Sequence, residues 1–290
     1  MSVTVTERAY AKINLSLDVT GRRADGYHEL VSVMQSISLC DTLTVSREGE
    51  GVVLDTGGAL SADESNLVCR AANAYFAAAG KRFGVRITLD KHIPMCAGLG
   101  GGSADAAATL RALNKLDKNR FDMETLSAIG ARVGADVPFC VMGGTRLCRG
   151  IGERMERVEN TLSAHVVIAI AGEGVSTPQA FAALDAEHGD FSLAAREAEQ
   201  RLPAILEALR FGDLDALSPL LYNRFEPVIE RERGAVSSLR EALLTAGATV
   251  ARMSGSGPAV FGLFESAETA ERAARALSRE NVTALACQLI

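Results

Sequence analysis

The chain has 290 residues, 48% of them hydrophobic, so it is long enough to bury a large core, and we expect two domains. Its formal net charge of -6, from 30 basic residues interspersed among 36 acidic ones, excludes a basic face for nucleic acid and a polybasic membrane segment. These properties predict a protein that acts on small molecules.

The N-terminal residues, the apolar runs and the cysteines and histidines indicate the compartment. The first ten residues alternate polar and apolar types and include Glu7 and Arg8, unlike a secretory signal. The most apolar run, residues 166–171, is far shorter than the roughly 18 residues of a membrane span. We expect a cytoplasmic protein with reduced thiols and no zinc site, because its cysteines and histidines lack CxxC, HExxH or HxH spacing. These residues are Cys40, Cys69, Cys96, Cys140, Cys148, Cys287, His28, His92, His165 and His188.

Short alternating runs in the first 45 residues predict β-structure, with a glycine-containing turn at residues 21–26. Apolar positions at helical spacing then predict a helix over residues 65–79. We expect Ser65 to cap this helix and Gly80 to end it.

A strand, a glycine loop and a helix follow in that order. Residues 85–89 alternate as a strand, glycines cluster at residues 98–102, and Ser103 is expected to open an alanine-rich helix that reaches about Leu116. A short helix is predicted over residues 123–133.

A polar stretch precedes the second half of the chain, and we place the domain boundary near residue 160, giving domains 1–160 and 161–290. The second half begins with a buried strand and three amphipathic helices and ends in the order strand, strand, helix, strand, which predicts an α+β sandwich. The expected ranges are 166–171, 193–211, 213–221, 233–245, 249–253, 260–264, 267–278 and a last strand from 282.

The strongest motif is Pro94-Met-Cys-Ala-Gly-Leu-Gly-Gly-Gly-Ser-Ala-Asp105, a glycine run directly before a helix. Glycines allow close approach to an anion, and the first N–H groups of a helix favour phosphate. Read in isolation, the run is equally compatible with a flexible loop. A Rossmann fingerprint needs glycine where Ser103 stands and a Walker A loop needs Gly-Lys-Ser/Thr, so neither applies.

This motif resembles the phosphate-binding motif of the GHMP kinases. Ala11-Lys12-Ile13-Asn14-Leu15 resembles the first motif of that superfamily, and Met253-Ser254-Gly255-Ser256-Gly257 resembles the third. The resemblance implies a two-domain α+β fold, with an N-terminal mixed α/β nucleotide-binding domain and a C-terminal ferredoxin-like domain. Cys96 departs from the pattern, where glycine is commoner; it removes no backbone donor, so phosphate binding is expected to survive.

Within the superfamily, the chain is similar to the branch that phosphorylates 4-diphosphocytidyl-2-C-methyl-D-erythritol in the methylerythritol phosphate pathway of isoprenoid biosynthesis. The similarity lies in the segments 11–15, 23–30, 98–106, 134–139 and 175–181. It implies ATP-dependent phosphorylation of the 2-hydroxyl of that substrate. The chemistry of ATP implies Mg2+ as well, and we expect a monomer or homodimer. The alternatives are another GHMP small-molecule kinase, of homoserine or mevalonate type, and a non-catalytic nucleotide sensor.

The resemblance also implies roles for individual residues. Asp136 is the expected general base, with Lys12 beside it to keep it ionised and to stabilise charge on phosphate. The alternative for Asp136 is an ordinary turn residue. Lys12 lies in an apolar segment, where an unpaired ammonium is costly, so an anionic partner is expected. Asn14 shares the face of Lys12 on a strand and is expected to bind substrate or orient Asp136.

The remaining expected contacts divide between substrate and ATP. Tyr27 and His28 are expected to contact the cytosine, Phe181 to supply the opposing face, and Thr177 to hold the substrate diphosphate or alcohol. Without the resemblance, Tyr27 and Phe181 would be interpreted as core aromatics and His28 as a turn residue. Ser103 is expected to bind phosphate or magnesium, or to cap its helix. The expected ATP-binding residues are Asn66, Leu67, Pro94, Gly98, Leu99, Gly100, Gly101, Gly102, Ser103 and Ala104. No protein carboxylate is assigned to a metal.

Overall fold

The computed structural model describes residues 3–58, 60–187, 190–279 and 281–290, so His188 lies outside the described residues. The chain forms two compact units. Unit 1 comprises Met1–Lys12, Leu39–Met95 and Gly100–Gly143, and unit 2 comprises Ile13–Ser38, Cys96–Leu99 and Gly144–Ile290. The units interleave along the sequence because strands β1 (Thr4–Arg22) and β2 (His28–Arg47) each contribute residues to both. The domain boundary predicted near residue 160 divides the chain differently from these two units, and it stays a prediction.

Unit 1 combines strands with four helices. Strand β3 (Val52–Asp55) pairs in parallel with β4 (Val85–Asp90), and β4 pairs antiparallel with residues 42–47 of β2. Every second residue of β4 is buried, as its alternation predicts. The helices are α1 (Leu67–Ala79), α2 (Gly101–Leu116), α3 (Met123–Ala131) and α4 (Val137–Met142). This mixed architecture confirms the fold expected for the nucleotide-binding part.

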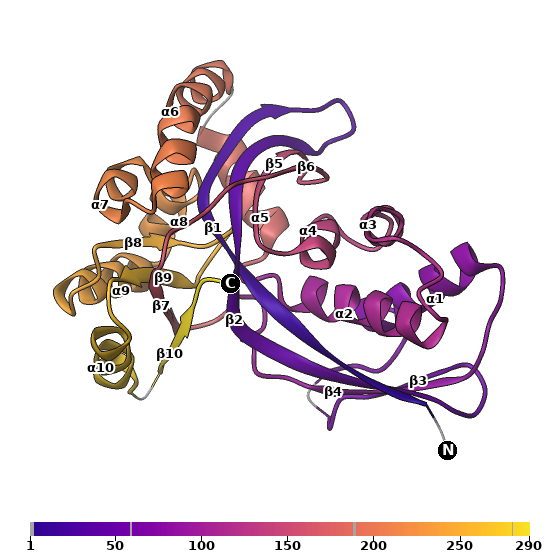
Figure 1. Cartoon of the computed structure of the whole chain (residues 1–290). Helices are drawn as coiled ribbons and strands as arrows, with labels where there is room; N and C mark the ends of the chain where they lie inside the picture. Colours follow the sequence, from indigo (N-terminus) through magenta and orange to yellow (C-terminus); the bar gives the residue numbers. More distant parts are fainter. Residues whose placement is uncertain (1–2, 59, 188–189, 280) are drawn as a thin grey trace. The chain divides into compact units, whose positions relative to one another are not determined.

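Helices α1 and α2 lie side by side in unit 1 (Figure 1). Most residues of α2 are buried, and many of them are alanines. Two expected helix starts are wrong. The cap of α1 is Asn66 rather than Ser65, since the Asn66 side chain accepts the Val68 N–H. Helix α2 begins two residues before Ser103, after Gly100 in the left-handed conformation, because glycine takes that conformation without strain.

The sheet of unit 2 confirms the ferredoxin-like expectation. Its strands lie in the order β10-β7-β9-β8, and all neighbours are antiparallel. The strands are β7 (His165–Ala171), β8 (Val250–Met253), β9 (Val260–Phe264) and β10 (Val282–Gln288). Residues 30–35 of β2 pair separately with β5 (Thr145–Gly150), which pairs with β6 (Arg154–Arg157).

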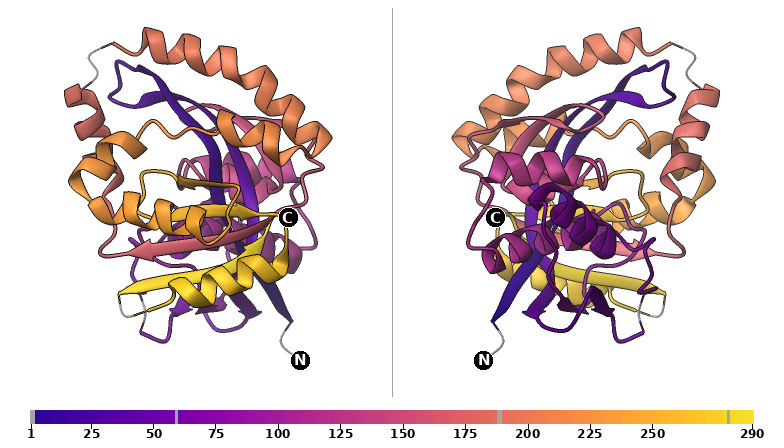
Figure 2. Two further views of the ribbon diagram at one scale, coloured as in Figure 1. Left: turned by 90° about the vertical axis from the view of Figure 1, so that its left-hand side faces the viewer. Right: turned by 90° about the vertical axis from the view of Figure 1, so that its right-hand side faces the viewer.

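Helices of unit 2 cover its sheet. Helix α10 (Ala267–Leu277) runs along β10 and β7 (Figure 2), and α9 (Gly234–Thr245) packs against β8 and β9. The others are α5 (Thr177–Glu187), α6 (Ser192–Phe211), α7 (Leu214–Leu217), the 3-10 turn η1 (Ser218–Leu220) and α8 (Glu226–Glu232). Helices α5 and α8 were not predicted from the sequence.

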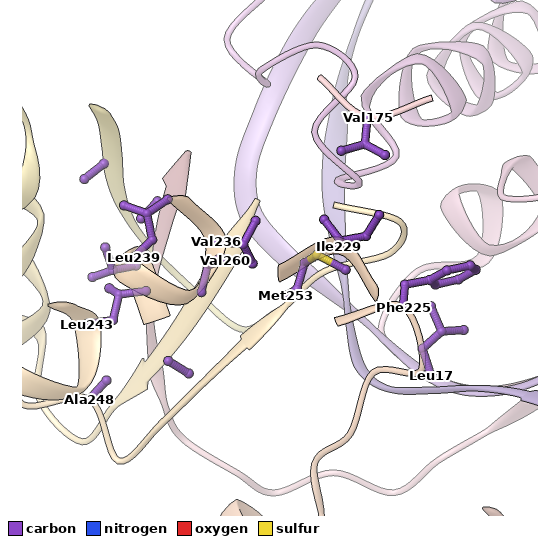
Figure 3. Close-up of a cluster of buried hydrophobic side chains, with 14 of the residues drawn as sticks. Leu17, Val175, Phe225, Ile229, Val236, Leu239, Leu243, Ala248, Met253 and Val260 are labelled. Atoms are coloured by element: carbon purple, nitrogen blue, oxygen red, sulfur yellow. The ribbon is translucent and has the colours of Figure 1, made fainter. Parts of the chain in front are cut away.

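The core of unit 2 joins these helices to the sheet. In the part of the cluster drawn in Figure 3, Met253 and Val260 from the sheet and Ile229 and Val236 from the helices lie together. Each of the four is at most 1% exposed. Burying such side chains contributes roughly 1.5–3 kcal/mol each, so this cluster holds the third motif at the end of β8 in place.

The described residues bear on three expectations from the sequence, on membrane spans, disulfides and metal clusters. None of the helices in the described ranges combines the length and apolar composition of a membrane span. The six cysteines, all within those ranges, form no disulfide. No group of three His, Cys, Asp or Glu side chains in the same ranges is arranged to hold a metal ion.

Candidate active site

An ammonium and a carboxylate from distant parts of the sequence meet in unit 1. Lys12 on β1 is 4% exposed, and its Nζ lies 3.5 Å from Oδ2 of Asp136. Asp136 directly precedes α4, and its side chain is 32% exposed. It makes no capping bond to its own helix, so the carboxylate faces Lys12 and remains accessible to a ligand. The anionic partner expected for Lys12 is therefore present.

The glycine loop lies against the stem of Lys12. Gly100 has a φ of +69°, and a Cβ there would lie 3.0 Å from Lys12 Cγ and 3.2 Å from Cε. Any side chain at this position would be strained and would push the lysine away. Gly100, the ammonium and the carboxylate thus share one region of unit 1. Helix α2 starts here, and the N–H groups of its first turn have no acceptor within the helix.

Ser103 is the third residue of α2, so the expectation that it caps the helix is wrong. Its Oγ lies 4.0 Å from the point that a Cβ on Gly134 would occupy, next to the turn that leads to Asp136. The serine hydroxyl is a hard oxygen donor. Its phosphate or magnesium role stays a prediction.

The residues expected beside adenine lie next to the same loop. Asn66 caps α1, and a Cβ on Gly102 would lie 3.2 Å from Cδ1 of Leu67. The first turns of α1 and α2 are therefore in van der Waals contact. A nucleotide with its phosphates at α2 would have its base within reach of α1.

Cys96, the departure from the family pattern, adopts a φ of +52° and is exposed. In unit 2, a Cβ on Gly174 would fall 2.4 Å from the Cβ of Cys96, so the loop keeps its course because residue 174 is glycine. The left-handed backbone explains why glycine suits position 96 better.

A serine of the third motif joins the first and second motifs in unit 2. Ser254 Oγ accepts the N–H of Asn14 at 3.4 Å and donates to the carbonyl of Gly98 at 3.1 Å. Gly98 has no room for a side chain, since its Cβ would lie 2.2 Å from the Ser254 carbonyl. The buried Asn223 supports this turn by donating to the carbonyls of Met253 and Gly255.

Sequence reasoning missed Ser254 and Asn223 as functional residues. Ser254 was visible within a motif, but nothing local marked Asn223. Asn14 itself is 2% exposed and donates through Nδ2 to Ser32 Oγ at 2.8 Å, which fixes its side chain.

The residues expected around cytosine gather in unit 2. His28 stacks directly on Phe181, with ring centroids 4.5 Å apart, so no base fits between these two rings. The role of Phe181 opposite Tyr27 stays a prediction. Nε2 of His28 lies 2.7 Å from Oδ1 of Asp185, a carboxylate on α5 that sequence reasoning missed. Tyr27 is 59% exposed and free to cover a ligand from the adjoining turn. Its cytosine contact stays a prediction.

Thr177, the first residue of α5, lies at the third motif. Its Oγ1 is 2.9 Å from the hydroxyl of Ser256, which is 7% exposed. Two hydroxyls in this arrangement can bind a phosphate or alcohol oxygen of a ligand.

The Cys140 thiol on α4 interacts electrostatically with both Asp136 and Lys12. Loss of solvent contact, reinforced by the Asp136 carboxylate, raises the pKa of the Cys140 thiol to about 12. The thiol therefore stays protonated at neutral pH.

Comparisons with known proteins agree on one family. Residues 66–144 match the family model for the GHMP kinases N terminal domain, and residues 203–283 match the GHMP kinases C terminal model. The chain is 44% identical to the 4-diphosphocytidyl-2-C-methyl-D-erythritol kinase of Desulfitobacterium hafniense (strain Y51), over 92% of this chain and 89% of that protein. It is also 44% identical to the same-named kinase of Moorella thermoacetica, over 94% of both chains.

A solved structure extends the likeness to three dimensions. The crystal structure of a 4-(cytidine 5'-diphospho)-2C-methyl-D-erythritol kinase superposes with a TM-score of 0.82 at 38% identity. The match covers 98% of this chain and 99% of that one.

Proposed function

Because the chain belongs to the 4-diphosphocytidyl-2-C-methyl-D-erythritol kinase family of the GHMP kinases, we propose that it transfers the γ-phosphate of ATP to the 2-hydroxyl of that substrate. The observation that carries the proposal is the 3.5 Å contact between Lys12 and Asp136 next to Gly100. The reaction would serve the methylerythritol phosphate pathway of isoprenoid synthesis.

ATP is proposed to bind along the first turns of α1 and α2. The N–H groups at the start of α2 and the helix dipole favour the phosphates there. Asn66 and Leu67 would adjoin the adenine. The proposed phosphate contacts are Pro94, Gly98, Leu99, Gly100, Gly101, Gly102, Ser103 and Ala104.

Phosphoryl transfer needs a nucleophile in line with the leaving group and positive charge around the moving phosphoryl. The oxygen of the 2-hydroxyl attacks the γ-phosphorus, the bond between that phosphorus and the bridging oxygen of ADP breaks, and the hydroxyl proton passes to Asp136. Lys12 offsets the growing charge on the phosphoryl oxygens and keeps Asp136 ionised.

The cytidyl substrate is proposed to bind residues of unit 2. Tyr27 would stack on the cytosine, the His28 ring would hydrogen-bond to it, and Phe181, which stacks on His28, would supply the opposing face. Thr177 would hold the diphosphate or alcohol portion, and Asn14 would contact the substrate beside Lys12.

Magnesium is proposed to enter with ATP and to neutralise its β- and γ-phosphate oxygens when bound. The Ser103 hydroxyl is a hard oxygen donor of the type this ion prefers. It fits an ion that is held mainly by phosphates and water, since no three-residue metal cluster occurs within the described ranges.

The alternatives lack comparable support. A homoserine or mevalonate kinase would not account for relatives 44% identical that carry the cytidyl name. A nucleotide sensor would not need the Lys12 and Asp136 pair. We propose the cytoplasm as the location, where thiols stay reduced, and a monomer or homodimer as the assembly.

The first test is a substrate panel. Purified protein with ATP and magnesium should release ADP when 4-diphosphocytidyl-2-C-methyl-D-erythritol is present, and phosphorus NMR should locate the new phosphate on the 2-hydroxyl. Homoserine and mevalonate serve as control acceptors. Turnover of either control, with none of the cytidyl compound, would sink the proposal.

The second test separates the base from the binding site. Asp136→Asn should lower kcat by about 10²- to 10⁴-fold, the usual contribution of a general base, while the Kd for ATP changes by less than about threefold. Cys140→Ser, on the helix that Asp136 precedes, is the control and should retain kcat within about threefold. An Asp136→Asn enzyme with unchanged kcat would refute the assignment of the base.

A further inference from the structure

Three buried charged side chains of unit 1, Lys91, Asp41 and Asp105, form a cluster that the proposed transfer does not use; we call it the Lys91 triad. Lys91 Nζ donates to Oδ2 of Asp105 at 2.9 Å and to Oδ2 of Asp41. Asp41 is 0% and Asp105 1% exposed. Burying charges is costly without strong pairing, so such a cluster persists only where its members hold one another.

Each carboxylate of the triad holds a different end of the glycine loop. Oδ1 of Asp41 accepts the N–H groups of His92 at 2.5 Å and Ile93 at 2.8 Å, directly before Pro94, where the loop begins. Asp105 lies in α2 just after the loop's last glycine. Lys91 bonds to both carboxylates and therefore links the entry of the loop to its exit.

The same residues also lie against the start of α2. A Cβ on Gly101 would lie 3.3 Å from Lys91 Nζ and 3.0 Å from Cγ2 of Ile93. Among the described residues, Oδ1 of Asp105 has no hydrogen-bond partner, so Lys91 supplies the hydrogen bond that holds this carboxylate. Loss of Lys91 would remove the cation that pairs with both buried carboxylates.

We propose that Lys91, held between Asp41 and Asp105, is a positioning residue that fixes both ends of the glycine loop in the geometry that binds ATP phosphates. Lys91 acts through the loop backbone rather than on the reacting atoms. The inference rests on the proposed function only in that the loop binds ATP. Phosphate binding by backbone N–H groups depends on their relative positions, so loosening either end weakens it.

Lys91→Met tests this role because it keeps the length of the side chain and removes the charge. The Kd of a fluorescent ATP analogue and the KM for ATP should both rise at least about tenfold. The KM for the cytidyl substrate should stay within about twofold. Lys81→Met is the matched control: Lys81 pairs with Asp117 at the opposite end of α2, so its loss should lower thermal stability and leave ATP affinity unchanged.

A second pair of variants decides the matter even if Lys91→Met fails to fold. Asp105→Asn retains an oxygen that accepts from Lys91, and Asp105→Leu does not. The amide variant should bind the ATP analogue within about twofold of the wild type, and the leucine variant about tenfold more weakly.

An ATP-analogue Kd within about twofold of the wild type in folded Lys91→Met, or in Asp105→Leu, would overturn the positioning role. The Kd measurement needs no acceptor substrate. A wild type that binds the analogue but phosphorylates nothing would therefore contradict the proposed function. The Kd values of the variants would still decide whether Lys91 positions the loop.

Discussion

Asp105 is a residue whose charge should depend on pH near neutrality. Burial raises its pKa to about 7, opposed by Lys91 and assisted by Asp41. The Cys140 thiol also faces this group and stays neutral. Between pH 4 and pH 7 the folded chain therefore holds a proton on Asp105 that the unfolded chain has released. The free energy of unfolding has a contribution that is present below pH 4 and is lost as pH rises to about 7.

Asp105→Asn should remove this contribution because the amide does not titrate. The difference in unfolding free energy, variant minus wild type, should therefore be about 1 to 3 kcal/mol larger at pH 8 than at pH 5. Urea denaturation at both pH values measures the difference. Asp117→Asn, at the other end of α2, is the comparison, and an equal effect of Asp105→Asn at the two pH values would contradict the titration.

At the scale of single elements, the start of α1 provides a matched comparison between two neighbouring capping residues. Asn66 accepts the Val68 N–H and donates to the Ser61 carbonyl, whereas the Ser65 hydroxyl donates to Asp63 outside the helix. Asn66→Ala should therefore cost about 1 kcal/mol of unfolding free energy, and Ser65→Ala less than about 0.5 kcal/mol.

Thermal or urea unfolding of the two variants measures this difference, and the KM for ATP tests the proposed adenine contact. Asn66→Ala should raise that KM, while Ser65→Ala should not. Equal stability losses would show that the cap does not act through Asn66.

The same helix start indicates how far sequence reasoning reaches. Serine and asparagine are both good caps, so the composition alone could not choose between Ser65 and Asn66. Periodicity predicted the long helices α6 and α9 and the strands of the ferredoxin-like sheet. It missed α5, which buries only Ala180 and Leu184 and so has little periodic signal.

The candidate site was predicted through motifs rather than periodicity. Lys12 and Asp136 are far apart in the sequence, and only the resemblance implied that they meet. Asn223, Asp185 and the Lys91 triad carry no local signature, because their roles arise from partners that the fold brings together. The mutual stacking of His28 and Phe181 likewise depends on α5, which was not predicted.

For the molecule as a whole, the shared strands have a consequence for unfolding. β1 and β2 each contribute residues to both units. Unfolding of either unit would therefore disrupt strands that continue into the other unit. We therefore expect one cooperative transition. The sequence contains no tryptophan, so a single introduced tryptophan reports on its own unit.

Phe121→Trp places such a probe in unit 1 and Tyr222→Trp places one in unit 2, both at partly buried aromatic positions. The two proteins should unfold at the same urea concentration. ATP at about 100 times its Kd should stabilise both by about 2.7 kcal/mol, although its proposed contacts with α1 and α2 lie in unit 1. If ATP shifted the Phe121→Trp transition and left the Tyr222→Trp transition in place, the units would unfold independently, and the continuity of β1 and β2 would not couple them.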